Sequence, residues 1–180
     1  MTASKNPTTL IPVSMELHHE ISQFYYREAR TLQERRYVDW LEEFVAQDIH
    51  YWMPVYELRL IRDKRPEPTP DDAAIYNDDY GELKQRVDRL STGQVWMEDP
   101  PSRIRYMISN IEVYAGGQAD EFKVYCNLAV YRHRRQMEIT EHHIGREDVL
   151  RKTADGLRIA RRKLNIDARV TQDKNLYFIA

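Results

Sequence analysis

The sequence has a single cysteine, Cys126, and this scarcity excludes several kinds of site. No second cysteine is present to form an intrachain disulfide. A Cys-rich zinc site and a self-contained iron–sulfur cluster are also excluded, because even a His-ligated [2Fe–2S] centre takes two cysteines from its own chain. Cys126 alternates with the apolar residues Val124 and Leu128. We therefore expect it to be a small, buried, unreactive side chain.

Long apolar runs and an excess of one charge are missing as well. No run approaches the roughly 20 residues of a membrane-spanning helix. The 27 Lys and Arg residues are balanced by 29 Asp and Glu, so the chain lacks the basic field that binds nucleic acid through its phosphates. The stretch Met1–Pro12 has one lysine and no apolar core, unlike a secretory signal. We expect a cytoplasmic protein that binds neither membranes nor nucleic acid.

The length of 180 residues is that of one domain, which buries about 70% of the surface of its unfolded chain. We assign residues 1–180 to a single domain with two irregular parts. The first is a flexible N-terminal arm, residues 1–13. The second is a long Pro-rich loop, residues 56–79, in which Pro66, Pro68 and Pro70 alternate. Loops of this length tend to be functional, bound to a partner or disordered.

Apolar residues at helical spacing predict three helices before the main sheet. The first begins behind Ser14, a candidate N-cap, and extends to Leu32. The second covers Tyr37–Val45, and Asp48 is expected to end its pattern. The third covers Glu82–Leu90, ahead of Gly93.

Alternating apolar residues and turn signals predict five strands. They are Ile49–Val55, Arg103–Tyr114, Glu121–Met137, Ile139–Lys152 and Leu157–Val170. The apolar parity switches from even to odd after Ile108 and from odd to even after Ile159. Such switches indicate bulges, which bend a sheet. The fold class is therefore α+β, with N-terminal helices packed into the concave side of a long, curved, mostly antiparallel sheet.

The histidines do not form a metal site at the level of the sequence. The triplet Glu141-His142-His143 contains the ligand types of a non-haem iron site, which are two histidines and one carboxylate. Neighbours on a strand point to opposite faces, however, so His142 and His143 do not share a metal from regular β geometry. His18 and His19 fail likewise, because adjacent helical residues are about 100° apart around the axis.

An acid–base site inside the domain is a rival interpretation. A cone-shaped α+β domain encloses an apolar pocket in which a carboxylate next to a tyrosine or histidine can move a proton. Asp48 and Tyr51 lie where such a pocket would begin, and Glu141 or His143 can face it from the sheet. This pattern allows a stand-alone lyase or isomerase, or a ligand-binding module of the same fold. Nucleophile and phosphate-binding motifs are absent.

Basic residues are frequent in two of the predicted strands. In the first, Arg132 and Arg134 share one face, and the second contains Arg158–Lys163. They are typical of a solvated or salt-bridged sheet face. Arginine is also favoured at protein interfaces, because its planar fork pairs with carboxylates through two bonds.

Four stretches occur in a specific order along the chain. They are Phe24–Ala29 with Arg36, Tyr37 and Trp40 behind it, then Asp48–Pro54, then Glu98–Arg105 with Ser109-Asn110, then Arg146–Arg151. Together they resemble the small (β) subunit of aromatic-ring-hydroxylating dioxygenases, of the toluene, biphenyl and naphthalene type. The resemblance covers the chain from about Leu17 onward. Tyr106 departs from it, since relatives commonly have histidine there.

The resemblance implies a cystatin-like, nuclear-transport-factor-like cone without catalytic, cofactor-binding or metal-binding residues of its own. It implies that a Rieske [2Fe–2S] cluster and a mononuclear Fe(II) belong to a separate large (α) subunit. Three large and three small chains then form a hexamer, which a ferredoxin and a reductase supply with electrons from NADH. The complete enzyme adds both atoms of O₂ to an arene and gives a cis-dihydrodiol. The arene itself is not specified by this chain.

An assembly subunit needs exposed residues that contact its partners. Trp96, Pro100, Pro101, Arg103 and Arg105 form a compact stretch rich in aromatic, proline and arginine residues. Such residues are enriched at interfaces or present a rigid turn to a partner. We expect this stretch to pack on another subunit.

Overall fold

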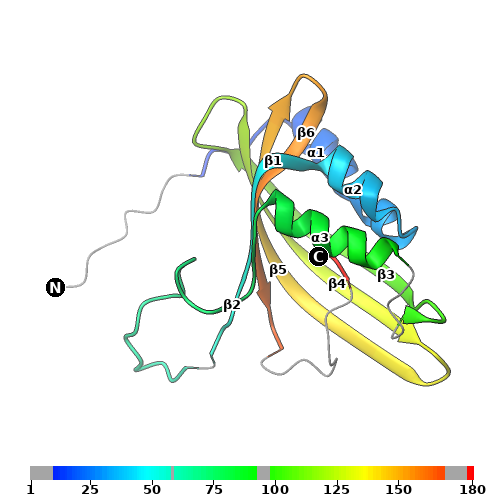
Figure 1. The fold of residues 1–180 in the computed structure, drawn as a ribbon. Coiled ribbons are helices and arrows are strands. Elements are labelled where there is room, and N and C mark those ends of the chain that lie inside the picture. Colours follow the sequence, from blue (N-terminus) through cyan, green and yellow to red (C-terminus); the bar gives the residue numbers. More distant parts are fainter. Residues whose placement is uncertain (1–9, 58, 93–97, 169–177) are drawn as a thin grey trace.

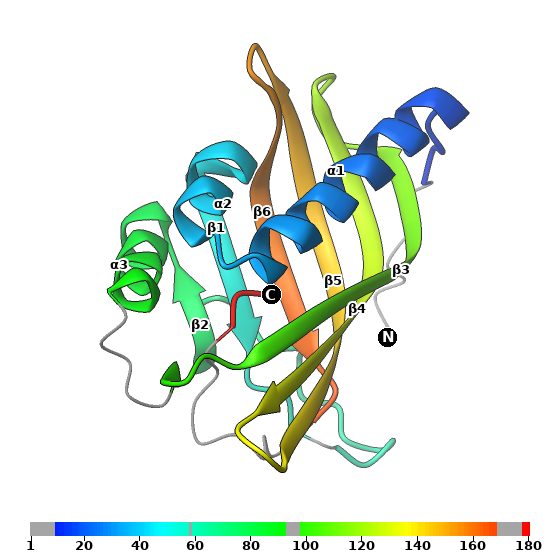
Figure 2. The same cartoon turned by 90° about the vertical axis from the view of Figure 1, so that its right-hand side faces the viewer.

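The computed structural model describes residues 10–57, 59–92, 98–168 and 178–180. Its helices are α1 (Met15–Gln33), α2 (Tyr37–Phe44) and α3 (Tyr80–Ser91). Its strands are β1 (Val45–Pro54), β2 (Ala74–Asp78), β3 (Arg103–Ala115), β4 (Glu121–Arg134), β5 (Glu138–Thr153) and β6 (Gly156–Ile166). The helices lie on one side of a strongly curved sheet (Figures 1 and 2). The α+β cone expected from the sequence is confirmed.

The described strands form one sheet in the order β2-β1-β6-β5-β4-β3. All neighbouring pairs are antiparallel except β1 and β6, which run parallel. A parallel pair needs a long connection between its two strands, and here β2, α3 and the strands β3–β5 lie between β1 and β6 in the sequence. β3 is left at one edge of the sheet, where a partner can reach its backbone.

Two bulges curve the sheet at the positions that the parity switches predict. In β3 the register with β4 shifts between Ser109 and Glu112, and Asn110 has a φ of 53°. In the β5–β6 pair the register shifts between Val149 and Leu150. Because of each bulge, the apolar residues before it and those after it all point toward the helices. The long strands therefore bend around α1 and do not lie flat.

The helix boundaries agree with capping chemistry more closely than with apolar spacing. Ser14 is the N-cap of α1 and its Oγ accepts a hydrogen bond from the N–H of Leu17 at 3.3 Å. Asp79 and Glu82 form a capping box, so α3 begins at Tyr80, two residues before the prediction. Asp48 lies inside β1, because α2 ends at Phe44 and the chain enters the strand at once. The expectation that Asp48 stops a helix was wrong.

The last part of the predicted loop 56–79 is a short strand. β2 pairs with β1, with Tyr51 opposite Asp78 and Met53 opposite Tyr76. The pairing depends on an edge that only the folded sheet provides, so the local sequence does not reveal it. The predicted N-terminal arm also has a fixed end, because the carbonyl oxygen of Ile11 accepts from the N–H of Ala115 at 2.9 Å.

The hydrophobic core fills the space between the helices and the concave side of the sheet. Its centre includes Phe24, Trp40, Met53, Leu128 and Leu150, all at most 2% exposed. Cys126 is buried in this core, as predicted, and burial raises the pKa of its thiol to about 11. No helix in the described ranges is long and apolar enough to cross a membrane.

The turn between β3 and β4 gives a sharp test of backbone packing. A Cβ atom on Gly116 would lie 2.5 Å from the carbonyl oxygen of Glu121, whereas one on Gly117 would meet nothing within 4 Å. We predict that Gly116→Ala lowers the free energy of unfolding by about 1–3 kcal/mol. Gly117→Ala changes it by less than about 0.5 kcal/mol. Urea denaturation of both variants measures the difference, and equal stabilities would contradict the turn geometry.

Candidate functional site

Four charged side chains meet at the centre of the cone. Glu28 comes from α1, Arg146 and Asp148 from β5, and Arg162 from β6. Their exposed fractions are 0%, 2%, 1% and 1%. The two strands bring their charges inward by alternation, because Arg146 and Asp148 share the inner face with Ile144 and Leu150. We call these four residues the central ion cluster.

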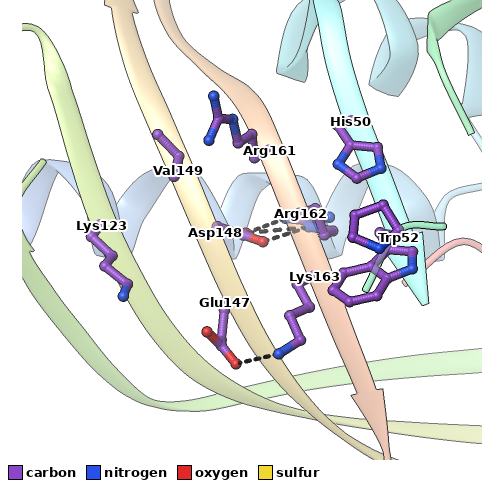
Figure 3. Close-up of a pocket in the computed structure, with 10 residues that line it drawn as sticks. His50, Trp52, Lys123, Glu147, Asp148, Val149, Arg161, Arg162 and Lys163 are labelled. Atoms are coloured by element: carbon purple, nitrogen blue, oxygen red, sulfur yellow. Dashed lines mark hydrogen bonds and ion pairs between the residues drawn. The ribbon is translucent and has the colours of Figure 1, made fainter. Parts of the chain in front are cut away.

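Arg162 joins the two acids of the central ion cluster. Its Nη1 lies 2.6 Å from Oε1 of Glu28, and its Nη2 lies 2.7 Å from Oδ2 of Asp148. Arg146 pairs with the other oxygen of Glu28 at 3.1 Å. Figure 3 shows the Asp148–Arg162 bonds from the outer side of the sheet, with α1 behind them. The cluster contains two positive and two negative charges, so it is neutral as a unit.

Neutral side chains complete the hydrogen bonding of both acids. The indole N–H of Trp40 donates to Oε1 of Glu28 at 3.0 Å. The hydroxyl of Tyr25 donates to Oδ2 of Asp148 at 2.8 Å. A buried charge is tolerated when its lone pairs are satisfied in this way. Each oxygen of Glu28 therefore already accepts two hydrogen bonds.

The electrostatics of the cluster keep Glu28 ionised. Burial by itself would raise the pKa of Glu28, but the guanidinium charges of Arg162 and Arg146 outweigh it and lower the pKa to about 2. A carboxylate with a pKa far below neutrality is a weak general base, and it has no proton to donate at pH 7. The cluster is thus suited to holding α1 against the sheet and not to moving protons.

Asp48 and Tyr51 do not form the acid–base pair that the sequence allows. The side chain of Asp48 is 62% exposed and pairs with Arg151 at 2.8 Å, and a hydrogen bond from Arg151 lowers its pKa. Tyr51 is 2% exposed and faces the interior. The two residues are three positions apart on β1, so alternation places them on opposite faces. The rival interpretation, in which Asp48 is a pocket acid inside the cone, is therefore wrong.

Glu141 and His143 also face away from the interior. Both are exposed on β5, and Nε2 of His143 lies 3.1 Å from Oε1 of Glu141. His142 is buried on the other face, which confirms that the two neighbouring histidines diverge. Across the ranges that the structure describes, no group of three or more His, Cys, Asp or Glu side chains is placed to hold a metal ion.

The outer face of the sheet has a shallow hollow of about 200 Å³, shown in Figure 3. His50 and Trp52 of β1 line one side of it. Lys163 lies across the hollow, 3.3 Å from Glu147 and 5.5 Å from the centre of the Trp52 ring. The charged groups that line this hollow are thus already paired in part, Lys163 with Glu147 and Arg162 with Asp148.

A second ion cluster lies beside the expected interface stretch and consists of Glu98, Ser102, Arg35 and Arg132. Glu98 accepts hydrogen bonds from Ser102, Arg35 and Arg132, the first from the backbone N–H of Ser102 at 3.1 Å. Burial by itself would raise the pKa of Glu98, but the hydrogen bonds from Ser102 and Arg132 outweigh it and lower this pKa. Arg35 also donates to the carbonyl oxygen of Ser102 at 2.6 Å. The Glu98–Ser102 segment is thereby fixed to the body of the domain.

The structure presents most of the expected interface residues to solvent. Pro100, Pro101, Arg103 and Arg105 are all exposed. Arg103 and Arg105 stand on the same face of the edge strand β3, opposite His133 and Tyr131 of β4. Trp96 lies outside the described residues.

The central ion cluster was not found from the sequence. Arg146, Asp148 and Arg162 carry charge at positions whose parity is that of buried apolar neighbours. This parity is the signal that could have revealed them. It was missed because charged residues in strands are usually read as solvent-facing.

A family comparison decides what kind of protein this is. Residues 27–173 match the family described as "Ring hydroxylating beta subunit". The chain belongs to this family. The β subunit of chlorobenzene dioxygenase from Cupriavidus sp. (strain PS12) is 36% identical over 93% of this chain and 90% of its own length. The β subunit of biphenyl 2,3-dioxygenase from Rhodococcus jostii (strain RHA1) is 33% identical over 99% of both chains.

Solved structures show the same fold. A chain of naphthalene 1,2-dioxygenase, in a structure with indole bound, superposes with a TM-score of 0.84 at 23% identity, over 92% of this chain and 86% of that one. The β subunit of benzoate 1,2-dioxygenase from Burkholderia mallei gives a TM-score of 0.69 at 21% identity, over 89% and 96%. A protein with a cystatin-like fold from Nostoc punctiforme gives 0.57 at 16% identity, over 89% and 98%. The cystatin-like cone expected for this β subunit is therefore confirmed.

The central ion cluster predicts a large cost for removing one of its charges. Glu28→Gln leaves Arg146 and Arg162 buried with one carboxylate fewer, and we expect a loss of about 3–5 kcal/mol in the free energy of unfolding. Glu43→Gln, exposed on α2, is the matched control and should change it by less than about 0.5 kcal/mol. Equal effects of the two substitutions in urea denaturation would refute a structural role for the cluster.

Wild type and Glu28→Gln are also expected to differ in how their stability depends on pH. The folded pKa of Glu28, about 2, lies below its usual value of 4.5, so this group stabilises the fold fully above pH 4.5. The stabilisation is lost as the pH falls from 4.5 to 2. Over that interval the stability difference between wild type and Glu28→Gln should shrink by about 3 kcal/mol. A difference that stays constant with pH would show that Glu28 is not held ionised by the two arginines.

Proposed function

We propose that this chain is the non-catalytic structural subunit of a multicomponent dioxygenase. The complete enzyme would convert aromatic hydrocarbons to cis-dihydrodiols with O₂ and electrons derived from NADH. The observation that carries the proposal is the central ion cluster, because Glu28 and Asp148 at the middle of the cone are already paired with Arg146 and Arg162. The β subunits of chlorobenzene and biphenyl dioxygenases, both over 30% identical, support the assignment to this reaction class.

The partner in this proposal is a large (α) subunit that carries the Rieske [2Fe–2S] cluster and the mononuclear Fe(II). Three large and three small chains would form the complex, and a ferredoxin and a reductase would deliver electrons in the cytoplasm, where NADH is available. The single buried Cys126 supports this division of labour, because one thiol is too few for a cluster. Substrate shape would then be read by the large subunit.

We place the contact with the large subunit at the start of β3. Arg103 and Arg105 project from this edge strand, and the second ion cluster fixes Pro100 and Pro101 next to them. One edge N–H, that of Tyr106, already donates to Oε1 of Gln33 at 3.2 Å. A rigid, exposed stretch with two arginines suits a partner surface that supplies carboxylates.

Reversing the charge of this stretch tests the proposed contact. In Arg103→Glu/Arg105→Glu, both groups meet a partner surface of the wrong sign, so we expect roughly tenfold less large subunit to be recovered with the tagged small chain. The yield and melting temperature of the small chain itself should not change. Quantitative co-purification, followed by the mass of the complex, measures the effect.

The matched control for this experiment is Arg27→Glu/Arg30→Glu. It makes the same change in charge on the exposed side of α1. Recovery of the large subunit with this control should equal the wild type. If both double variants co-purify equally well, the contact lies elsewhere on the chain.

Two further substitutions separate this function from an acid–base enzyme. Asp48 and His143 are exposed on the outer side of the domain, so Asp48→Asn and His143→Ala should leave turnover of an arene by the assembled complex within about twofold of wild type. Product formation per iron is the measurement. Loss of turnover with intact assembly and full iron content would place chemistry in this chain.

A further inference from the structure

The interior of the cone contains a piece of the chain itself. Phe178, Ile179 and Ala180, which we call the tail, are 4%, 5% and 1% exposed. Figure 2 shows the tail between the helices and the sheet. The tail therefore fills part of the space between the helices and the sheet.

The tail is held by polar contacts as a bound peptide would be. The hydroxyl of Tyr51 donates to the carbonyl oxygen of Ala180 at 2.6 Å and accepts from the N–H of Ala180 at 3.0 Å. Nη1 of Arg162 donates to the same carbonyl oxygen at 3.2 Å. The Tyr51 hydroxyl therefore bonds with both the N–H and the carbonyl oxygen of Ala180, and the guanidinium group of Arg162 lies beside it.

An apolar subsite accompanies this polar one. The ring of Phe178 packs on the imidazole of His142, with 5.1 Å between ring centres and an angle of 33° between planes. Both residues are buried, and His142 is 3% exposed. An aromatic group therefore occupies one part of the interior, and a carbonyl group two residues later occupies the other.

Two more polar atoms in the interior are unsatisfied among the described residues. They are the hydroxyl oxygen of Tyr106 and Nε of Arg146, both buried and without a hydrogen-bond partner. Burial raises the pKa of Tyr106, so its hydroxyl keeps its proton and is available as a donor. Unsatisfied buried donors are rare in folded proteins and suggest an acceptor that enters with a ligand or a water molecule.

We propose that the cone is a binding socket for a small molecule in which an aromatic or branched apolar group is joined to an amide or carboxylate, and that the tail is its resident occupant. Tyr51 and Arg162 recognise the carbonyl, and His142 packs against the ring. An external ligand of this class competes with the tail for the same contacts. This binding role goes beyond the proposed scaffold function and does not depend on it.

The experiment removes the tail and supplies it as a separate molecule. The probe is acetyl-Phe-Ile-Ala, used both as the free acid and as the amide, which tells a carboxylate from an amide ligand. We expect the chain without residues 178–180 to melt at a lower temperature than the full chain, and either probe to raise it again in a saturable way. Calorimetric titration should show at least tenfold weaker binding to the full chain, whose socket is filled.

Substitutions identify the contacts responsible. In the shortened chain, Tyr51→Phe removes the hydroxyl and should weaken the probe about tenfold, whereas Tyr26→Phe, exposed on α1, should not. Acetyl-Ala-Ile-Ala should also bind about tenfold more weakly, because it lacks the ring. Should the shortened chain fail to fold, Phe178→Ala in the full chain replaces it, and the probe should then raise the melting temperature of this variant only.

Three results would overturn the proposal. The first is an unchanged melting temperature after removal of the tail. The second is equal binding of the probe to the full and shortened chains, which places the probe outside the socket. The third is a folded shortened chain, or a folded Phe178→Ala chain, on which the probe has no effect.

Discussion

The structure depends on one interaction, the pairing of Glu28 on α1 with Arg146 and Arg162 on the sheet. Charges taken out of water are costly, and a buried ion pair returns little net stability unless each partner is well placed. The same cost makes misplacement expensive, because a shift of α1 by one turn would take Glu28 away from Arg146 and leave Arg162 with one acid, Asp148, where it now has two. The cluster therefore fixes the position of the helix on the sheet, while apolar packing on either side supplies most of the stabilisation.

This constraint explains why the acidic side chains inside the β subunit differ in role from those on its surface. The two acids of the central ion cluster are hydrogen-bonded and paired with arginines, and the pKa of Glu28 is lowered to about 2, so it stays ionised. The acids that remain accessible lie on the outer face of the sheet, Asp48 in an ion pair with Arg151 and Glu141 next to His143. Because these interior acids are already paired, the interior is not suited to acid–base chemistry, and the proposed contact with the large subunit lies on the surface. The exposed start of β3, fixed by Glu98 and Ser102, is a surface of this kind.

The sequence predicted those features that depend on short-range patterns. Period-two alternation gave the long strands, the burial of Cys126 and the divergence of His142 and His143. Parity switches located both bulges, because a bulge is a local event on one strand.

Features that depend on distant partners were not predictable in the same way. β2 forms only because the edge of β1 is available, and the central ion cluster assembles from α1, β5 and β6, which are distant in sequence. The rival interpretation placed Tyr51 at a pocket with Asp48, yet the Tyr51 hydroxyl bonds with Ala180. No local pattern connects these two residues. The identity of the family came instead from the order of several short stretches along the chain.

The most direct test is the iron content and arene turnover of the purified chain, measured alone and again after addition of the large subunit. A scaffold subunit predicts no stoichiometric iron and no product alone, with both present in the mixed complex. Stoichiometric iron or cis-dihydrodiol formation by this chain in the absence of any other would contradict the account.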